Sequence, residues 1–344
     1  MSIENPLISI VIVNYDGKEL LRECLGTVFA EKKVSFEVIV VDNGSSDGSV
    51  EFLHEKYPDV KVVENKHNTG FAPANNQAIL MARGKYILTL NNDTELAEGF
   101  IKEISTAAEL SEDDVGMWAP KILSIFDKET IDSVGGLLLY PDGIGRGRGR
   151  MEKDTGQFNE VEEVLLPSAC AALYRKTMLD HIGLFDEDFF AYCEDTDLGL
   201  RARSYGWRCF SVPSAVVYHH YSATGGRYSS LKAYLVERNR AWVAVKNLPL
   251  TLLLKSPFYT LYRYLLQLLS VFGGRGSAGG LMKEAGGVSL ALVLLRSYAS
   301  IIRGFFGALG KRRKIMKERK ISSRDFAGLL SRFTLSAKEL VFKD

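Results

Sequence analysis

Three carboxylates lie within four residues in the stretch FFAYCEDTDLGLRARSYGW, residues 189–207. Carboxyl groups beside aromatic side chains can be poised as general bases, which take a proton from an attacking hydroxyl group. The N-terminus of a helix also favours negative charge, and this explains one or two of the three. Asp197 and Arg201 are four residues apart on the predicted helix and suit an ion pair. Glu194 and Asp195 therefore remain as candidate bases, and their spacing does not choose between them.

Asp93 and a pair of histidines could hold a metal ion. Asp93 follows a predicted buried strand in TLNNDTEL, where its carboxylate could bind a hard divalent cation that bridges a diphosphate. A helix cap before a helix from about Ala97 would explain Asp93 equally well. His219 and His220 end the predicted strand RCFSVPSAVVYHH and point to opposite faces, so at most one can join Asp93. We favour His219.

The elements that must position these side chains are strands that alternate with helices. Apolar, β-branched runs predict buried strands at residues 7–13, 36–41, 60–64 and 86–90, and the helical patterns between them predict a parallel sheet. Ligands of such sheets bind beyond the carboxyl ends of the strands. Polar residues follow three of these strands: Asn14, Asp16, Asp42, Asn43, Asn91, Asn92 and Asp93. Taken alone, Asp42 also reads as a turn residue in DNGSSDGS.

Composition restricts the class of protein. The 344 residues include 43 Lys and Arg against 42 Asp and Glu, so no overall field points to nucleic acid. The four cysteines form no C-x-x-C pair and lie among apolar neighbours, which predicts buried thiols in a reducing compartment. The beginning, MSIENPLISI, does not have the pattern of a signal peptide. We expect a cytoplasmic protein, free or peripheral on the cytosolic face of the inner (plasma) membrane.

The composition changes after about residue 248. The apolar segment LPLTLLLKSPFYTLYRYLLQLLSVF carries Lys255 and Arg263, and each charge at the centre of a bilayer costs about 2.5–3.5 kcal/mol on insertion scales. Each Leu contributes a gain of roughly 0.5 kcal/mol, and two such charges nearly cancel the summed gain of all the leucines. This segment is therefore not predicted to span the membrane.

A second apolar helix, VSLALVLLRSYASIIRGFF, has a narrow polar stripe. Ser289, Arg296 and Arg303 recur every seven residues, Ser300 lies near them, and a basic run follows at residues 311–320. This pattern predicts a helix that lies in the membrane interface with its cations on anionic head groups. The alternatives are a helical bundle packed on the catalytic part, or the dimer surface of a homo-oligomer.

Seven segments, in this order and spacing, resemble the family 2 glycosyltransferases, and most of all their bacterial rhamnosyltransferase-like members. They are SIVIVNYDG, VIVVDNGSSDGS, NTGFAPANNQAI, YILTLNNDTEL, FDEDFFAYCEDTDLGLRARSYGW, VPSAVVYHHYSATGG and ERNRAWVAVKN. The resemblance implies an α/β fold of the GT-A type, a Rossmann-like, mainly parallel mixed sheet flanked by helices. It implies a catalytic domain at residues 1–247, with a nucleotide-sugar half at about 1–115 and an acceptor half at about 116–247. Residues 248–344 would form a helical, membrane-associating extension.

The resemblance also implies roles for single residues. Asp42 would contact the nucleotide base, Asp93 and His219 would hold the metal ion, and Asp195 would be the general base, with Glu194 shaping the site. Asn91 stands where the family's D-x-D motif has its first Asp, so it supplies an amide and no charge. The remaining nucleotide and donor residues would be Asn14, Tyr15, Asn43, Asn68, Gly70, Asn75, Asn76, Asn91 and Asn92.

The implied reaction is an inverting sugar transfer that depends on Mg²⁺ or Mn²⁺. The donor would be a nucleotide diphosphate sugar, dTDP-rhamnose before a UDP-sugar, and the acceptor a glycan or a polyprenyl-linked sugar in surface polysaccharide synthesis.

A dinucleotide oxidoreductase would need G-x-G-x-x-G where this chain has NYDGKELL. A non-catalytic scaffold with a degenerate transferase fold is the remaining alternative, and Asn91 is its only support.

Overall fold

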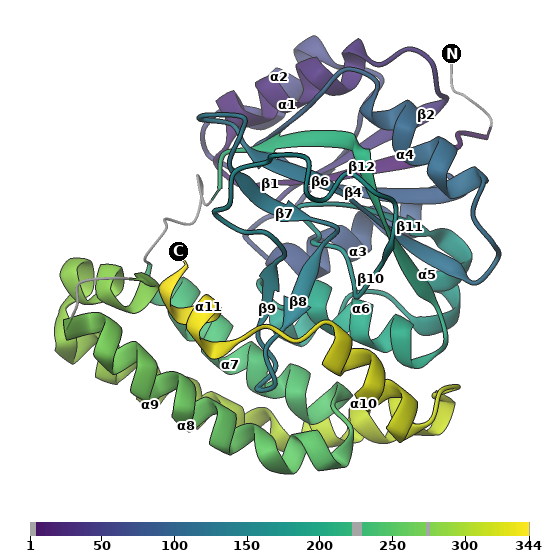
Figure 1. Ribbon diagram of the computed structural model, residues 1–344. Coiled ribbons are helices and arrows are strands. Elements are labelled where there is room, and N and C mark those ends of the chain that lie inside the picture. Colours follow the sequence, from purple (N-terminus) through teal and green to yellow (C-terminus); the bar gives the residue numbers. More distant parts are fainter. Residues whose placement is uncertain (1–4, 222–228, 273–275, 344) are drawn as a thin grey trace.

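The computed structural model describes residues 5–221, 229–272 and 276–343 (Figure 1). A mixed sheet forms its centre. The strands, in spatial order, are β10 (Glu163–Val164), β12 (Arg208–His219), β6 (Val115–Ser124), β11 (Ala171–Arg175), β4 (Tyr86–Asn91), β1 (Ile8–Asn14), β2 (Phe36–Asp42) and β3 (Lys61–Glu64). Two short strands, β5 (Thr94–Leu96) and β7 (Ile131–Val134), pair with β12 and β6. A separate hairpin joins β8 (Leu137–Leu139) and β9 (Gly145–Gly147).

The four predicted strands are present, and each begins and ends within one residue of its predicted bounds. β1 lies between β2 and β4 and is parallel to both. β11 is antiparallel to both of its neighbours, which makes the sheet mixed. Because β1, β2 and β4 run in the same direction, their carboxyl ends meet at one edge of the sheet, as the sequence predicts.

Helices cover both faces of the sheet (Figure 1). One layer holds α1 (Lys18–Ala30), α2 (Ser49–Lys56) and α4 (Phe100–Glu109); the other holds α3 (Phe71–Met81), α5 (Lys176–Ile182) and α6 (Glu194–Ser204), which follows the short 3-10 helix η1 (Glu187–Phe189). The alternation along β1 explains the two layers, since Ile10 packs with Leu25 of α1 and Val11 packs with Ala78 of α3. Both faces are buried, so the strands read as continuous apolar runs. The predicted burial of the thiols is found at Cys24, Cys170 and Cys209, and Cys193 is half-buried.

The C-terminal part consists of five helices: α7 (Ser230–Asn247), α8 (Leu250–Phe272), α9 (Gly276–Glu318), α10 (Ser323–Arg332) and α11 (Ala337–Phe342). They lie below the sheet in Figure 1, where α8 and α9 run side by side along the lower edge. The proposed boundary at residue 247 falls at the end of α7. Since α7 packs on α9 as well as on α6, it connects the two parts of the chain.

A buried cluster of charges ties α8 to the rest of the protein. Arg263 of α8 donates to Asp142 at 2.7 Å and to Glu237 of α7 at 3.0 Å. Arg240 pairs with both of these carboxylates, and all four side chains are at most 9% exposed. Removing one partner from a buried ion pair leaves an uncompensated charge, so this cluster fixes α8 on the catalytic part.

Part of the polar stripe of α9 faces the protein. Ser300 shares a hydrogen bond of 2.9 Å with Tyr234 of α7, and the guanidinium of Arg296 lies 5.1 Å from the centre of the same ring. In the basic run, Lys311 pairs with Asp186, and Arg312 donates to the carbonyl oxygens of Val245 in α7 and of Leu248 just after it. These four groups face α7 and the catalytic part, where partners lie that the pattern of α9 alone cannot reveal. Arg303 of the stripe and Arg313, Lys314 and Lys317 of the basic run are exposed. That the helix places its cations on lipid head groups therefore stays a prediction.

Among the described residues, one helical segment is long and apolar enough to cross a membrane. It runs from Gly287 to Glu318 within α9; its most apolar 18-residue stretch has a mean hydropathy of 1.4, and only 11% of that stretch is buried. Its length and composition are weak signs of membrane association, and they do not distinguish a spanning helix from one that lies on a surface.

Candidate active site

Asn14, Asp42 and Asn92 form a chain of hydrogen bonds across the strand ends. Asn14 and Asp42 are register partners on β1 and β2, and Asn14 Nδ2 donates to Asp42 Oδ2 at 3.0 Å. Asn92, after β4, donates from Nδ2 to Asn14 Oδ1 at 2.8 Å. Asp42 also accepts from the N–H groups of Gly44 and Ser45, at 3.1 and 2.8 Å. Asp42 is therefore a turn residue and also part of the polar floor at this edge.

Asn43 and Asn68 shape the loop that leads into α3. Asn43 Nδ2 donates to the carbonyl oxygen of Gly70 at 3.1 Å, and Asn68 Oδ1 accepts from the Gly70 N–H at 2.9 Å. Gly70 has φ +99°, and a Cβ there would lie 2.6 Å from the carbonyl oxygen of Phe190. Only glycine combines this backbone conformation with such a close approach. The loop thus rests on the segment that precedes Glu194.

The other predicted donor residues have different surroundings. Asn75 donates to the carbonyl oxygen of Phe71 within α3, at 2.9 Å. Asn76 exchanges two hydrogen bonds with the backbone of Phe185, at 2.9 and 3.1 Å, so its amide joins α3 to the acceptor half. Tyr15 is 39% exposed at the rim. The structure brings Asn14, Asp42, Asn43, Asn68, Gly70 and Asn92 to one sheet edge, and Asn76 is engaged within the protein.

Asp93 and His219, 126 positions apart in the numbering, meet in the fold. Asp93 Oδ1 lies 3.3 Å from His219 Nε2, and both side chains are less than 10% exposed. Burial opposes ionisation of Asp93, but the neighbouring imidazole of His219 lowers the pKa of the carboxyl group. Asp93 Oδ1 and Asn91 Oδ1 are buried without a hydrogen-bond partner. Buried oxygens of this kind beside an imidazole nitrogen fit a divalent cation such as Mg²⁺ or Mn²⁺.

A third residue of this cluster, Asp132, was not predicted from the sequence. Its Oδ2 lies 2.7 Å from His219 Nδ1, and its other oxygen pairs with Arg150. A carboxylate on the far nitrogen of an imidazole fixes the ring orientation and the tautomer of a metal-binding histidine. Asp132 is the one charged residue in the short strand β7, and that was its only local signal.

His220 points away from this cluster, as the alternation of a strand requires. Its Nε2 lies 3.6 Å from Glu23, and these two residues form a half-exposed group with Glu95. The preference for His219 over His220 as the partner of Asp93 therefore agrees with the geometry.

Glu194 and Asp195 are neighbours with different environments. Asp195 accepts hydrogen bonds from the N–H groups of Ala169 and Thr196, at 3.2 and 2.6 Å, and from the Thr196 hydroxyl at 3.2 Å. Glu194 Oε2 is buried with no partner. Burial, and then the charge of Asp195, raises the pKa of Glu194 well above its ordinary value; burial also raises the pKa of Asp195. Hydrogen bonds to a carboxylate favour its ionised form, so of the two neighbours Asp195 has the surroundings that favour the charged state.

Asp197 has the structural role that its spacing predicts. Its carboxylate is fully buried and accepts from Arg201 at 3.4 Å, four residues along α6. Lys246 and Asn247 at the end of α7 also contact it, at 2.7 and 2.8 Å. These contacts anchor the start of α6, which carries the two candidate bases.

The dyad Glu194–Asp195 and the pair Asp93–His219 are joined through one short segment. Ala169 donates to Asp195, and the carbonyl oxygen of the next residue, Cys170, accepts from the Asn91 N–H at 2.8 Å. This segment therefore contacts both the start of α6 and the end of β4. Tyr192 lies close to both, since its pKa is raised to about 12 by burial and by the charges of Glu194 and Asp93, among others.

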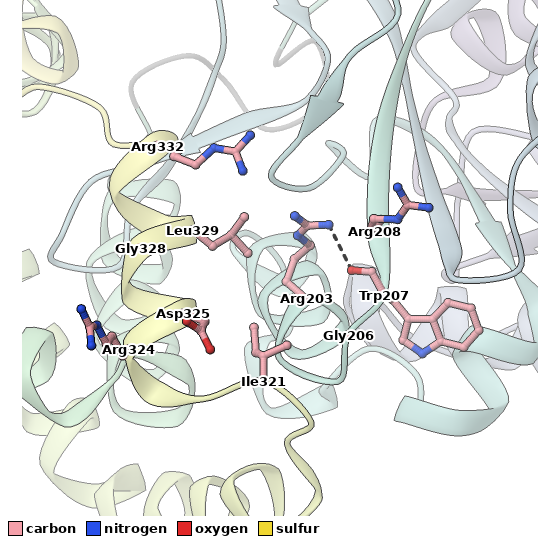
Figure 2. A pocket seen from close by; sticks show the side chains of 10 residues that line it. All are labelled: Arg203, Gly206, Trp207, Arg208, Ile321, Arg324, Asp325, Gly328, Leu329 and Arg332. Atoms are coloured by element: carbon pink, nitrogen blue, oxygen red, sulfur yellow. Dashed lines mark hydrogen bonds between the residues drawn. The ribbon is translucent and has the colours of Figure 1, made fainter.

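A cavity of about 640 Å³ lies elsewhere, between α10 and the start of β12 (Figure 2). In Figure 2 the guanidinium of Arg332 points toward that of Arg203, while Arg324 points away. Arg203 pairs with Glu163, and Arg208 pairs with Asp114 and Glu112. The cavity opens at the amino end of β12, whereas His219 ends that strand, so it is not part of the candidate active site.

Comparison with known families agrees with this geometry. The chain matches the model of Glycosyl transferase family 2 over residues 9–183, half of its length. It therefore belongs to this family and is a glycosyltransferase. It is 25% identical over 281 residues to the N-acetylglucosaminyl-diphospho-decaprenol L-rhamnosyltransferase of Mycobacterium tuberculosis, covering 69% of this chain and 86% of that protein. It is 26% identical to the O-antigen biosynthesis protein RfbC of Myxococcus xanthus, covering 64% of this chain and 18% of the relative.

Solved structures with the same architecture cover nearly the whole chain. TarS residues 1–349 from S. aureus aligns with a TM-score of 0.54 at 18% identity, over 94% of this chain and 89% of that chain. The mannosyltransferase PcManGT from Pyrobaculum calidifontis, in complex with GDP-Man and Mn²⁺, aligns with a TM-score of 0.51 at 17% identity, over 92% and 86%. At these identities the likeness shows the fold, which is the GT-A type expected from the sequence.

Proposed function

We propose that this glycosyltransferase moves a sugar from a nucleotide diphosphate donor to a glycan or lipid-linked acceptor, with inversion at the anomeric carbon. Surface polysaccharide or cell-wall synthesis is the process that we propose for it, because its relatives are named for such roles. One observation supports the reaction above all. Ala169 contacts Asp195, and the next residue, Cys170, contacts Asn91, two positions before Asp93, which lies beside His219. A base and an anion-stabilising centre are the two components that the transfer needs.

Asp195 is the general base of this proposal. It takes the proton from the acceptor hydroxyl group while that oxygen attacks the anomeric carbon. The bond from this carbon to the diphosphate breaks, and the nucleoside diphosphate leaves with the electron pair. A single displacement of this kind inverts the anomeric centre. The raised pKa of Asp195 makes it a stronger base than a free carboxylate, and its three hydrogen bonds favour its ionised form over that of Glu194.

Asp93 and His219 would hold Mg²⁺ or Mn²⁺, and Asp132 would orient the imidazole. The cation, when bound, supplies charge that stabilises the departing diphosphate. Asn91, which replaces the first Asp of the family motif, would accept a hydrogen bond from a ribose hydroxyl group. The polar floor of Asn14, Asp42 and Asn92 would receive the nucleotide, together with Asn43 and the Asn68–Gly70 loop.

The donor sugar that we favour is rhamnose, as dTDP-rhamnose, with a UDP-sugar as the next choice. The support is the relative from Mycobacterium tuberculosis, whose name specifies a rhamnosyltransferase acting on a decaprenyl-linked substrate. A few hydrogen bonds to sugar hydroxyl groups decide such a preference, so the donor must be identified by experiment.

The membrane partner that we propose is the cytosolic face of the plasma membrane. Exposed apolar side chains gather on α8 and α9, which run along the lower edge of the molecule in Figure 1. They include Leu254, Phe258, Leu261, Leu265, Leu268, Leu269, Val288, Leu292, Leu295, Ile302 and Phe306. Soluble monomers rarely expose an apolar surface on this scale. A bilayer surface that holds a lipid-linked acceptor would cover it and bring the acceptor to the enzyme.

The decisive experiment is a donor screen. Purified protein is incubated with dTDP-, UDP- and GDP-sugars and Mg²⁺ or Mn²⁺, and the released nucleoside diphosphate is measured. We expect release from one donor and loss of that release on chelation. If no donor releases nucleoside diphosphate and calorimetry shows no nucleotide binding, the scaffold alternative would be favoured.

Two matched variants test the assignment of the base. We expect Asp195→Asn to lower turnover by about 10²- to 10⁴-fold while nucleotide binding is kept. Glu194→Gln keeps the neutral state of its site, so its turnover should fall by less than about tenfold. Equal losses in the two variants, or normal turnover in Asp195→Asn, would show that the base is misassigned.

A further inference from the structure

The segment just before the dyad has an unusual backbone. Phe190, Tyr192 and Cys193 have φ values of +65°, +69° and +66°, and none of them is glycine. Residues other than glycine adopt this left-handed region at a cost in free energy, and they stay there only when their surroundings hold them. Cys193 is the residue before the first turn of α6, so this strained loop, residues 189–193, sets where Glu194 and Asp195 begin.

One side chain of α7 donates hydrogen bonds to three carbonyl groups of the loop. Asn239 is fully buried, and its Nδ2 donates to the carbonyl oxygens of Phe189, Ala191 and Tyr192 at 3.0, 2.8 and 2.7 Å. An amide has two N–H groups, so two of the three acceptors share one hydrogen atom. The contacts span the length of the loop and hold its strained turn closed.

Arg238 fixes the direction of this amide. Its Nε donates to Asn239 Oδ1 at 2.7 Å, and its Nη2 donates to the carbonyl oxygen of Phe189 at 2.8 Å. Because a guanidinium only donates, Oδ1 must face Arg238 and Nδ2 must face the loop. The guanidinium also lies 4.5 Å from the centre of the Trp242 ring, which holds it in place.

The carbonyl group that Asn239 does not take faces the donor half. The Phe190 oxygen accepts from the Ala72 N–H at 3.1 Å, beside the close approach at Gly70. The loop is thus held by α7 on one side and by the start of α3 on the other. A shift of the loop would move the dyad relative to the donor residues.

We propose that Asn239 is a positioning residue of the transferase, which acts by holding the strained loop 189–193 so that the Asp195 carboxylate is aimed at the acceptor. The inference rests on the proposed function for the identity of the base. Asn239 itself contacts no reacting group, and Arg238 assists it by fixing the amide.

Asn239→Asp is the first variant, because a carboxylate of the same shape cannot donate to three carbonyl groups. We expect kcat to fall by about 100-fold, because a displaced base loses part of the rate enhancement that a positioned base supplies. The KM for the donor sugar should stay within about threefold of wild type. Asn159→Asp adds the same charge at an exposed position and should leave both constants unchanged. An equal fall in both variants would overturn the proposal.

The variant Cys193→Gly tests whether Asn239 acts by holding the strained loop or by another route. Glycine adopts positive φ without strain, so Cys193→Gly should reduce the need for Asn239. We expect the double variant to be at least about tenfold more active than the product of the two single losses predicts. Losses that simply multiply would mean that Asn239 acts by another route.

Amide hydrogen exchange gives a readout that needs no turnover. In Asn239→Asp, exchange of the amides of residues 189–196 should become faster by about tenfold or more, while the β1–β2 core stays protected. If the wild type shows no transferase activity but this local loosening occurs, the positioning role stands and the proposed reaction fails. Unchanged exchange over residues 189–196 would overturn the positioning role.

Discussion

At the scale of single residues, the hydrogen-bond partners of each candidate catalytic group distinguish its role more than its residue type does. Glu194 and Asp195 are adjacent and have the same chemistry, yet three hydrogen bonds reach one and none reaches the buried Oε2 of the other. His219 is likewise defined by what its two nitrogens meet, Asp93 on one side and Asp132 on the other. Residue type alone could not have divided these roles.

Asp132 gives a prediction at this scale. If it orients His219 for a metal ion, Asp132→Asn should raise the Mn²⁺ concentration needed for half-maximal nucleotide release by about 10- to 100-fold. Calorimetric titration with Mn²⁺ should show the same weakening. Glu129→Gln, at an exposed carboxylate in the turn before β7, is the matched control and should change neither value. A full effect on turnover with an unchanged metal titration would argue against the orienting role.

At the scale of elements, α7 connects the loop before α6, α6 itself and α9. Its Asn239 holds the loop before α6, its last two residues bind Asp197 inside α6, and its other side packs on α9. Trp242 lies so close to Gly304 of α9 that a Cβ there would be 2.4 Å from the indole. The position of the dyad therefore depends on a helix that begins more than thirty residues after it.

The ionisation of Asp186 gives a prediction about how α7 and α9 stabilise this part of the protein as the pH changes. Burial opposes its ionisation, but Lys246 of α7 and Lys311 of α9 lower its pKa to about 2 from the usual 3.8. A lowered folded-state pKa means stability that is present above pH 3.8 and is lost as the pH falls toward 2. Asp186→Asn should therefore lower the free energy of unfolding by about 2 kcal/mol at pH 7.

The measurement is urea unfolding at several pH values. The difference between wild type and Asp186→Asn should shrink steadily from pH 4 to pH 2. Asp180→Asn removes a more exposed pair with Lys176 and should change the free energy by no more than about 0.5 kcal/mol at any pH. A constant difference across the range would mean that Asp186 acts through packing and not through its charge.

At the scale of the whole molecule, the C-terminal helices are bound to the catalytic part by buried charges and present apolar side chains outward. The cluster of Asp142, Glu237, Arg240 and Arg263 holds α8, while the outer sides of α8 and α9 stay uncovered. This arrangement keeps a fixed distance between the apolar surface and the dyad. A membrane on that surface would therefore meet the active site in a defined orientation.

Vesicle flotation tests this arrangement. We expect the protein to float with vesicles that contain anionic phospholipid, and the variant Leu254→Glu/Leu265→Glu to float at least about tenfold less, because it places two charges on the apolar surface. Leu80→Glu/Leu110→Glu changes two leucines on the catalytic part that are more exposed than the test pair, and this variant should float like wild type. Equal flotation of all three proteins would remove the support for a membrane-facing role of α8 and α9.

The sequence by itself determined the features that depend on local pattern. Apolar runs placed the first four strands to within a residue, because a strand buried on both faces needs a continuous apolar run. The polar residues that follow those strands had to meet at one edge, because parallel strands end together, and Asn14, Asp42 and Asn92 do meet there. The ion pair of Asp197 and Arg201 followed from helical spacing alone.

The tertiary structure decided what depends on partners far away in the chain. Asp132 reaches His219 from 87 residues away, and Asn239 reaches the dyad loop from about 50, so no local pattern marks either residue. The polar stripe of α9 was visible in the sequence, but an amphipathic pattern does not say what its polar side will meet. The structure places Ser300 and Arg296 of that stripe against Tyr234 of α7, which offers a hydroxyl group and an aromatic ring there, while Arg303 is exposed.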